Sequence, residues 1–172
     1  MARRNDPVRA IHSTHSTLRE RIVEHVFVGE ALRSLWRRGI VDVEVLRAEF
    51  DAHGYDLVIG RGKVVRHIQF KTGLAKRPGE VSVPLALSSK PAGCVLWIHV
   101  TDGLELGPFF WFGGKADKPL PALGAAVPRR PTRNRLGQRP PRVNHRVIQA
   151  DEFERMETID EVLAALLGDL TP

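Results

Sequence analysis

The chain has 172 residues, of which 42% are hydrophobic, 27% are charged and only 6% are aromatic. These values are ordinary for a globular protein, so they argue against a fully disordered chain, a collagen or a coiled-coil rod, and the length corresponds to about one domain. The 26 basic residues outnumber the 20 acidic ones and give a net charge of +6. This charge favours a polyanionic partner, although ribosomal contacts or solubility alone would give the same sign.

Cysteine content and apolar run length limit the possible classes further. The single cysteine, Cys94, excludes an internal disulfide and a multi-cysteine zinc site, and its apolar neighbours at 95–98 predict a core residue rather than a nucleophile. No apolar run approaches the roughly 18 residues that cross a membrane, so no membrane partner is expected. Arg3 and Arg4 are not followed by an apolar stretch, so a secretory signal is not predicted and the cytoplasm is the default compartment.

The N-terminal part of the chain predicts one long helix. Residues 1–14 are polar and predict a flexible leader, so that 15–172 form a single domain. From about Ser16 to Gly39, apolar residues recur at helical spacing. Ser16 or Thr17 is a suitable N-cap, and the cations and the glycine at the other end are typical of a helix C-terminus.

Strand-like runs follow this helix, several of them rich in valine or aromatic residues. They cover residues 40–46, 55–59, 64–70, 81–87, 94–100 and 106–112. The second and third runs are separated by the four residues 60–63, which include two glycines and are typical of a hairpin loop. The run at 94–100 is the most continuously apolar one and predicts a buried central strand.

The C-terminal part changes character. Residues 113–146 hold six of the 12 prolines and predict a long loop. After the loop, apolar spacing predicts a helix over about 160–167, capped by Thr158 or Asp160 and stopped by Gly168. Helix, strands, loop and helix in this order predict an α/β fold with a mixed sheet.

Three polar residues of the predicted hairpin could carry chemistry. Because strand side chains alternate between faces, Gln69 and Lys71 point the same way, and the hairpin brings Asp56 onto the neighbouring strand. A carboxylate, an amide oxygen and an ammonium group then converge on one sheet face. Metal-dependent phosphodiester hydrolysis uses such groups: oxygens bind the hard cation, the cation acidifies a water, and the lysine orients that water or neutralises developing charge.

Other polar residues near this hairpin are further candidates for the site, and three of them also have a purely structural interpretation. Glu30 lies beside the apolar face of the first helix, where a carboxylate is either solvated at the edge or directed at a ligand. His67 has the strand parity of the glutamine and the lysine, so it either contacts phosphate or is a partly exposed strand residue. Asp51 is an alternative ligand or a turn residue, and His53 also flanks the predicted site.

These residues, in this order, resemble the PD-(D/E)XK nuclease superfamily over roughly residues 20–112. Asp56, in a Gly-x-Asp-Leu-Val strand, looks like the first acid of the superfamily. Gln69-Phe70-Lys71 resembles its acid-x-Lys element. Glu30 matches the first-helix glutamate of the branch that includes archaeal Holliday-junction resolvases and many restriction enzymes. The resemblance implies a restriction-endonuclease-like domain, with a central mixed sheet and a helix on each side.

Position 69 departs from the superfamily, which usually has Asp or Glu there, although Gln-x-Lys variants occur among active members. An amide oxygen can bind a cation but brings no charge. The resemblance implies a Mg²⁺ site, with Mn²⁺ as a substitute, held by Asp56, Gln69, the backbone carbonyl of Phe70 and Glu30. The C-terminal residues 151–167 are also similar to the tails of small uncharacterised relatives.

An acid-free, arginine-rich segment lies inside the predicted loop, over residues 128–146. Its seven arginines are Arg129, Arg130, Arg133, Arg135, Arg139, Arg142 and Arg146. Arginines without acids cannot neutralise one another, so the segment should stay open until it meets a polyanion, and it suits contacts with a phosphate backbone. The alternative is an insertion that only improves solubility.

The sequence therefore leads to three functional hypotheses. The first is a Mg²⁺-dependent nuclease acting on DNA, with Glu30, Asp56, Gln69 and Lys71 as catalytic residues. The second is a nucleic-acid-binding module of the same fold with little catalysis, because Gln69 carries no charge. The third is a basic domain that binds an acidic protein. A homodimer is compatible with each of them.

Overall fold

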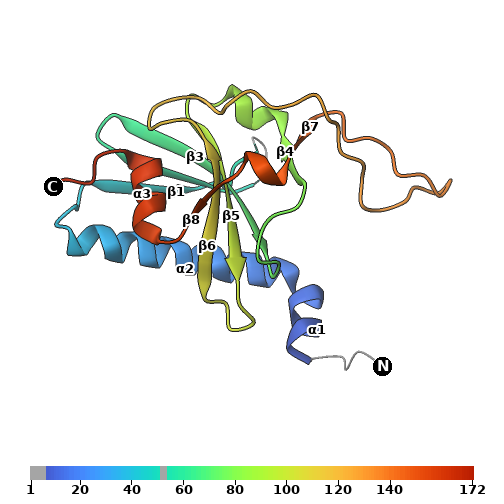
Figure 1. Ribbon diagram of the computed structural model, residues 1–172, viewed down its shortest axis with the longest axis horizontal. Helices are drawn as coiled ribbons and strands as arrows, with labels where there is room; N and C mark the ends of the chain where they lie inside the picture. The colour runs from blue at the N-terminus through green and yellow to red at the C-terminus, as the bar shows by residue number, and fades with distance from the viewer. Residues whose placement is uncertain (1–6, 51–53) are drawn as a thin grey trace.

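The computed structural model describes residues 7–50 and 54–172 (Figure 1). The α-helices of this part are α1 (Pro7–Thr14), α2 (Ser16–Arg37) and α3 (Ile159–Leu167), and short 3₁₀ helices occur at η1 (Leu85–Ser89) and η2 (Ala150–Glu152). The strands are β1 (Val43–Arg47), β2 (Leu57–Arg61), β3 (Val64–Gly73), β4 (Val81–Pro84), β5 (Gly93–Val100), β6 (Leu106–Gly113), β7 (His145–Ile148) and β8 (Glu154–Met156).

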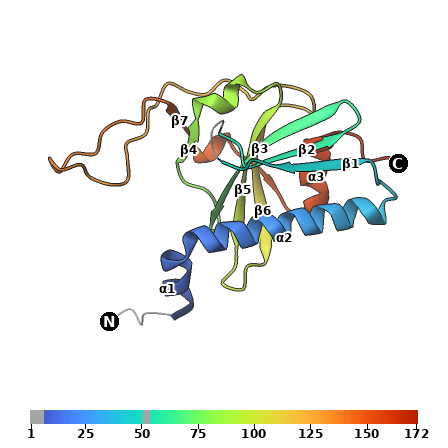
Figure 2. The same ribbon diagram turned by 180° about the vertical axis from the view of Figure 1, so that it is seen from behind.

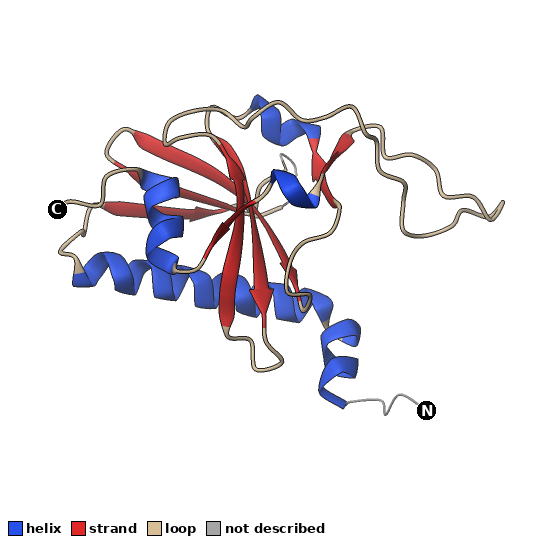
Figure 3. Cartoon of the chain, in the orientation of Figure 1, coloured by secondary structure: helices blue, strands red, loops and turns tan. Residues whose placement is uncertain are grey.

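Six of these strands form the main sheet, in the order β1-β2-β3-β5-β6-β8. Neighbouring strands are antiparallel except β3 and β5, which run parallel from His67 opposite Gly93 to Gly73 opposite His99. The sheet is strongly twisted, so that β1 and β2 cross the direction of β5 and β6 (Figure 3). The mixed α/β class predicted from the sequence is confirmed.

Helices α2 and α3 pack on the same face of this sheet. Val23, Phe27 and Leu35 of α2 belong to one buried cluster with Val162 and Leu166 of α3. The expectation of a helix on each side is therefore wrong. The two helices lie next to each other because their apolar stripes share one layer over the aliphatic residues of β2, β3 and β5.

The opposite face is covered by a two-stranded ribbon instead of a helix. Strands β4 and β7 pair antiparallel, and together with η1 they bury Val83 and Leu87 against Val95 and Trp97 of β5. The strand predicted at 81–87 thus ends at Pro84, since proline has no N–H group for further pairing.

The chain departs from the sequence prediction at the N-terminus. Residues 7–14 form α1 rather than a loose leader, with Pro7 at the first helical position, where its missing N–H group costs nothing. His12 is buried and its Nε2 lies 3.2 Å from the Asp102 carbonyl in the β5–β6 turn, so α1 is held against the sheet. The first six residues of the predicted leader lie outside the described residues.

Local turn and cap predictions are partly right. Thr158 caps α3: its hydroxyl accepts the Glu161 N–H at 3.2 Å, and Gly168 ends the helix at φ +80°. For α2 the N-cap position is His15, so neither Ser16 nor Thr17 caps it. The β2–β3 loop has two residues instead of four because the strands pair as far as Arg61 and Val64.

The proline-rich loop contains a projecting, hairpin-like arm, which we define as residues 128–142. Its two legs are joined by backbone hydrogen bonds from Arg130 N–H to the Pro140 carbonyl at 2.9 Å and from Arg142 N–H to the Pro128 carbonyl at 2.8 Å. Every side chain from 129 to 139 is exposed. Figures 1 and 2 show the arm extending beyond the body of the protein, at the same end as α1 and the start of α2.

No helix in the described part of the chain combines enough length with enough apolar character to cross a bilayer.

Candidate functional site

A cavity of about 330 Å³ lies beside the start of β2, where β3 extends beyond β2. Leu57 opens β2 opposite Ile68, whereas β3 runs on to Gly73, so within the described residues the segment 69–73 lacks a strand partner on the β2 side. Backbone groups at this open edge of β3 are available to side chains or ligands. The N-terminal half of α2 supplies the other wall of the cavity.

The segment that enters β2 is fixed by a close backbone contact at Gly54. This residue has φ +74°, and a Cβ atom there would come within 2.9 Å of the Pro84 side chain in β4. Only glycine accepts both conditions. The tight contact sets the path of Asp56, whose N–H group donates to the Ile68 carbonyl at 2.8 Å.

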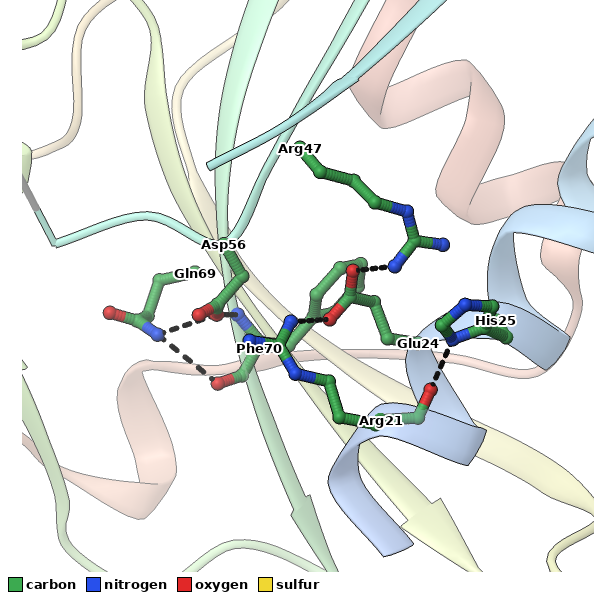
Figure 4. A network of polar contacts seen from close by, with 7 residues as sticks. All are labelled: Arg21, Glu24, His25, Arg47, Asp56, Gln69 and Phe70. Carbon is green, nitrogen blue, oxygen red and sulfur yellow. Dashed lines mark hydrogen bonds and ion pairs between the residues drawn. The ribbon is translucent and has the colours of Figure 1, made fainter. Parts of the chain in front are cut away.

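Asp56 and Gln69 meet at the open edge of β3 (Figure 4). One carboxylate oxygen of Asp56 accepts the Phe70 N–H at 2.7 Å and the Gln69 Nε2–H at 2.7 Å. The same Nε2 lies 3.4 Å from the Phe70 carbonyl oxygen. The Gln69 side chain is buried, so these contacts hold its amide between two oxygens.

Lys71 lines the same cavity, two residues after Gln69. Gln69 and Lys71 lie opposite Val95 and Trp97 of β5, so strand alternation places both side chains on one face of the sheet. Lys71 makes no ion pair within residues 7–50 and 54–172. The structure thus brings Asp56, Gln69, Phe70 and Lys71 together, and their roles remain a prediction.

Glu30 does not line this cavity; Glu20 and Glu24 of α2 do. Glu30 lies six residues after Glu24, which corresponds to about 9 Å along the helix and about 240° around it. Periodicity could not choose between the two glutamates, because Glu24 lies three residues before the buried Phe27 and Glu30 three residues after it. The position of each glutamate along the helix decides which of them reaches the cavity, and this outcome depends on how α2 packs on the sheet.

Glu24 is a carboxylate that sequence reasoning did not identify as a candidate. Its side chain is only 6% exposed and contacts two guanidinium groups. Arg21 donates from Nη1 at 3.1 Å, and Arg47 donates to the other carboxylate oxygen. Glu20 is 59% exposed and lies 3.8 Å from Arg19, which makes it a weakly held surface acid.

The other candidates near the hairpin are not placed in the cavity. His67 shares the sheet face of Gln69 but packs edge-on against Tyr55, with ring centroids 4.9 Å apart. Burial, and then the charge of Lys90, lower the pKa of His67, which favours a neutral ring at neutral pH. Asp51 and His53 lie outside the described residues.

The cavity offers some, but not all, of the oxygen ligands that a divalent cation needs. Within the described residues, no group of three or more His, Cys, Asp or Glu side chains could hold a metal ion. The Asp56 carboxylate and the Phe70 carbonyl already offer oxygen, and a half-turn of the Gln69 amide would replace its N–H donor by Oε1. These oxygens suit Mg²⁺ in kind, with one carboxylate fewer than an Asp–Glu pair would supply.

The arm begins close to the segment that carries Asp56. Its C-terminal leg continues into β7, where His145 pairs with Pro84, and Pro84 in turn contacts Gly54. In the described part of the chain none of the seven arginines at 129–146 forms an ion pair with an acid. Several instead bond to backbone carbonyls of the same segment, such as Arg129 to Arg139 at 3.0 Å.

Cys94 lies in the core, as the sequence predicts. It is fully buried, and burial raises the pKa of its thiol to about 12. A thiol of this kind is protonated at neutral pH and is not a nucleophile.

Comparison with models of protein families found no match to this chain, and a search of curated protein sequences found none either.

Proposed function

We propose that the chain is a metal-dependent nuclease with a restriction-endonuclease-like fold that hydrolyses phosphodiester bonds, most suitably in DNA. The observation that carries the proposal is the cavity at the open edge of β3, which Asp56, Gln69 and Lys71 line together. A carboxylate, an amide and an ammonium meet there at the edge of the sheet, brought together by the β2–β3 hairpin.

Each of these residues has a role that follows from its chemistry. Asp56, the carbonyl of Phe70 and the Oε1 atom of Gln69 would hold Mg²⁺ or Mn²⁺. The ion, when bound, supplies a Lewis acid that polarises the phosphate and lowers the pKa of water. Lys71 orients the attacking water or stabilises the negative charge that develops on the phosphate oxygens.

The arm supplies the reason to prefer a nucleic acid as the substrate. Its arginines from 129 to 139 are exposed, no arginine of the arm pairs with an acid in the described part of the chain, and its base lies beside the segment that carries Asp56. Arginines of this kind bind a phosphate backbone without reading its sequence. The arm would therefore hold the polyanion while the cavity acts on one of its phosphates.

One observation favours a second function, that of a nucleic-acid-binding module with little catalysis. The Gln69 amide donates towards the oxygens of both Asp56 and Phe70, so in this arrangement a neutral N–H group interacts with the oxygens proposed as metal ligands. A cation must reverse that amide and break its bond with Asp56. A site that keeps the amide as a donor would bind DNA through Lys71 and the arm alone.

The test is incubation of the purified chain with supercoiled, linear and single-stranded DNA in the presence of Mg²⁺ or Mn²⁺, with Lys71→Ala beside the wild type. The nuclease proposal expects metal-dependent cleavage of at least one DNA form by the wild type and none by the variant. DNA binding without cleavage by either protein would favour the binding module.

A further inference from the structure

Glu24 lies between two arginines that come from different elements. Arg21 precedes it by one turn of α2, whereas Arg47 ends strand β1 and lies opposite Leu57 at the start of β2. Each arginine contacts a different oxygen of the Glu24 carboxylate. A carboxylate with 6% exposure requires such partners, because an unpaired buried charge is costly.

The charges of this group do not cancel. Two guanidinium groups against one carboxylate leave one positive charge in excess. Glu24 and Arg21 line the cavity, whereas Arg47 contacts Glu24 and is not part of the lining. Arg47 therefore neutralises Glu24 without lining the cavity, and Arg21 remains as the cation that this group contributes to the cavity, in addition to Lys71.

Arg21 has the geometry of an anion-binding group. Its side chain is 57% exposed, and Figure 4 shows it extending from α2 towards Asp56 and Phe70. A guanidinium has about five N–H donors, and the Glu24 bond uses one of the donors of Arg21. Its side chain has no other hydrogen-bond partner within residues 7–50 and 54–172. A planar group with free donors is suited to bidentate contact with a phosphate.

We propose that Arg21 binds a phosphate group of the nucleic-acid strand inside this cavity, and that Glu24 and Arg47 are positioning residues that hold it there. The inference rests on the proposed function, since it concerns the same cavity. It adds a contact that needs no metal ion, separate from Asp56 and Lys71. The ligand class is a phosphodiester of a nucleic-acid strand.

The first experiment measures DNA affinity by fluorescence anisotropy, in EDTA and over a series of salt concentrations, with a short labelled duplex. Arg21→Ala should reduce the steepness of the log–log salt dependence by about 0.9 units, the value for one phosphate contact on duplex DNA. Arg33→Ala is the matched control, because Arg33 is exposed on the same helix and outside the cavity. It should leave the slope unchanged. Equal slopes for the two variants would overturn the inference.

The second experiment separates positioning from simple charge. Glu24→Gln makes the protein more positive, so charge alone would tighten DNA binding. If Glu24 positions Arg21, the variant binds more weakly despite its extra charge. Arg47→Ala should resemble Arg21→Ala, since Glu24 would then cancel the charge of Arg21. Arg47→Ala should weaken binding less in the Arg21→Ala background than in the wild type, because there is then no Arg21 to position. Independent, additive losses would contradict the positioning role.

The outcomes distinguish this inference from the nuclease proposal. Cleavage that needs Lys71, together with an Arg21→Ala slope equal to that of Arg33→Ala, would overturn the phosphate contact and leave the nuclease intact. A flattened slope without any cleavage would support the contact and reject the nuclease. Thermal melts identify variants that unfold, and if Glu24→Gln does so, the two arginine variants carry the test.

Discussion

The cavity at the start of β2 and the arm at 128–142 both present cationic side chains, but the cavity also contains carboxylates whereas the arm has none, and the two regions hold their side chains differently. In the cavity, Asp56 and Gln69 are fixed by hydrogen bonds of 2.7 Å, and the open edge of β3 forms the floor. In the arm, the side chains from 129 to 139 are exposed on two legs that bond mainly to each other. Side chains in fixed positions are suited to catalysis, and exposed cationic side chains are suited to binding a nucleic acid.

Arg66 shows that exposure, and not residue type, makes this difference. Its side chain is fully buried and donates to four backbone carbonyls, among them Leu166 at 3.0 Å and Ala165 at 3.0 Å near the end of α3. Burial lowers the pKa of its guanidinium. An arginine with four of its five N–H donors directed at carbonyls ties α3 to β3 and, being fully buried, is not accessible to a ligand.

The largest effect is expected from Asp56→Ala, which removes the only carboxylate among the proposed metal ligands. Cleavage should fall by about 10³-fold or more, in the range seen when a catalytic group is lost. DNA affinity without metal should stay the same or increase, because a carboxylate near a phosphate repels it. Parallel cleavage and anisotropy measurements check this. A joint loss of both would mean that Asp56 supports the fold instead.

The next effect concerns the arm and its contribution to DNA affinity. The variant replaces four of its arginines with alanine: Arg129, Arg130, Arg133 and Arg135. Each phosphate contact contributes about 0.9 to the log–log salt slope on duplex DNA, so the slope should flatten by up to about 3.6 units. The melting temperature should not change, because these side chains are exposed. An unchanged slope and affinity would place the DNA-binding surface elsewhere.

A smaller effect is expected from Gln69→Glu, which restores the usual acidic pair beside Asp56. Two carboxylates repel each other without a cation, so the metal-free variant should melt at a lower temperature than the wild type. Mg²⁺ or Mn²⁺ should then raise its melting temperature more than that of the wild type, since a second carboxylate tightens metal binding and tighter binding to the folded state gives more stabilisation. Turnover need not rise. Identical metal responses in the two proteins would argue against a cation at this position.

The smallest effect concerns His67, which lies next to the cavity but outside it. Its pKa is lowered in the folded protein by burial and by Lys90, so the unfolded chain takes up the proton first as the pH falls below about 6.5. The free energy of unfolding should therefore decrease between about pH 6.5 and the lower folded pKa. His67→Gln should remove this step in denaturant titrations. A step that persists in the variant belongs to another group.

The sequence predicted the strand side of the candidate site better than the helix side. Alternation along β3 placed Gln69 and Lys71 on one face, and the short hairpin brought Asp56 beside them. These relations are local, with at most 15 residues between the partners. Glu24 could not be separated from Glu30 because both flank the same apolar stripe, and only the packing of α2 on the sheet decides which one reaches the cavity.

Long-range pairing explains the other differences. The second helix was expected on the far face, but that face is taken by the ribbon of β4 and β7, whose partners Val81 and Ile148 are far apart in sequence. The same ribbon places the base of the arm beside Gly54. Neither contact has a periodic signal in the sequence, so neither could be predicted.

The central claim is that the cavity performs the chemistry and the arm provides affinity. It is tested most directly by the cleavage rate at saturating protein concentration with Mn²⁺, for Lys71→Ala and for the variant with four arm arginines replaced. The account predicts no cleavage by Lys71→Ala and a rate close to that of the wild type for the arm variant, once its weaker binding is overcome. Cleavage by Lys71→Ala at the wild-type rate, with none by the arm variant, would contradict it.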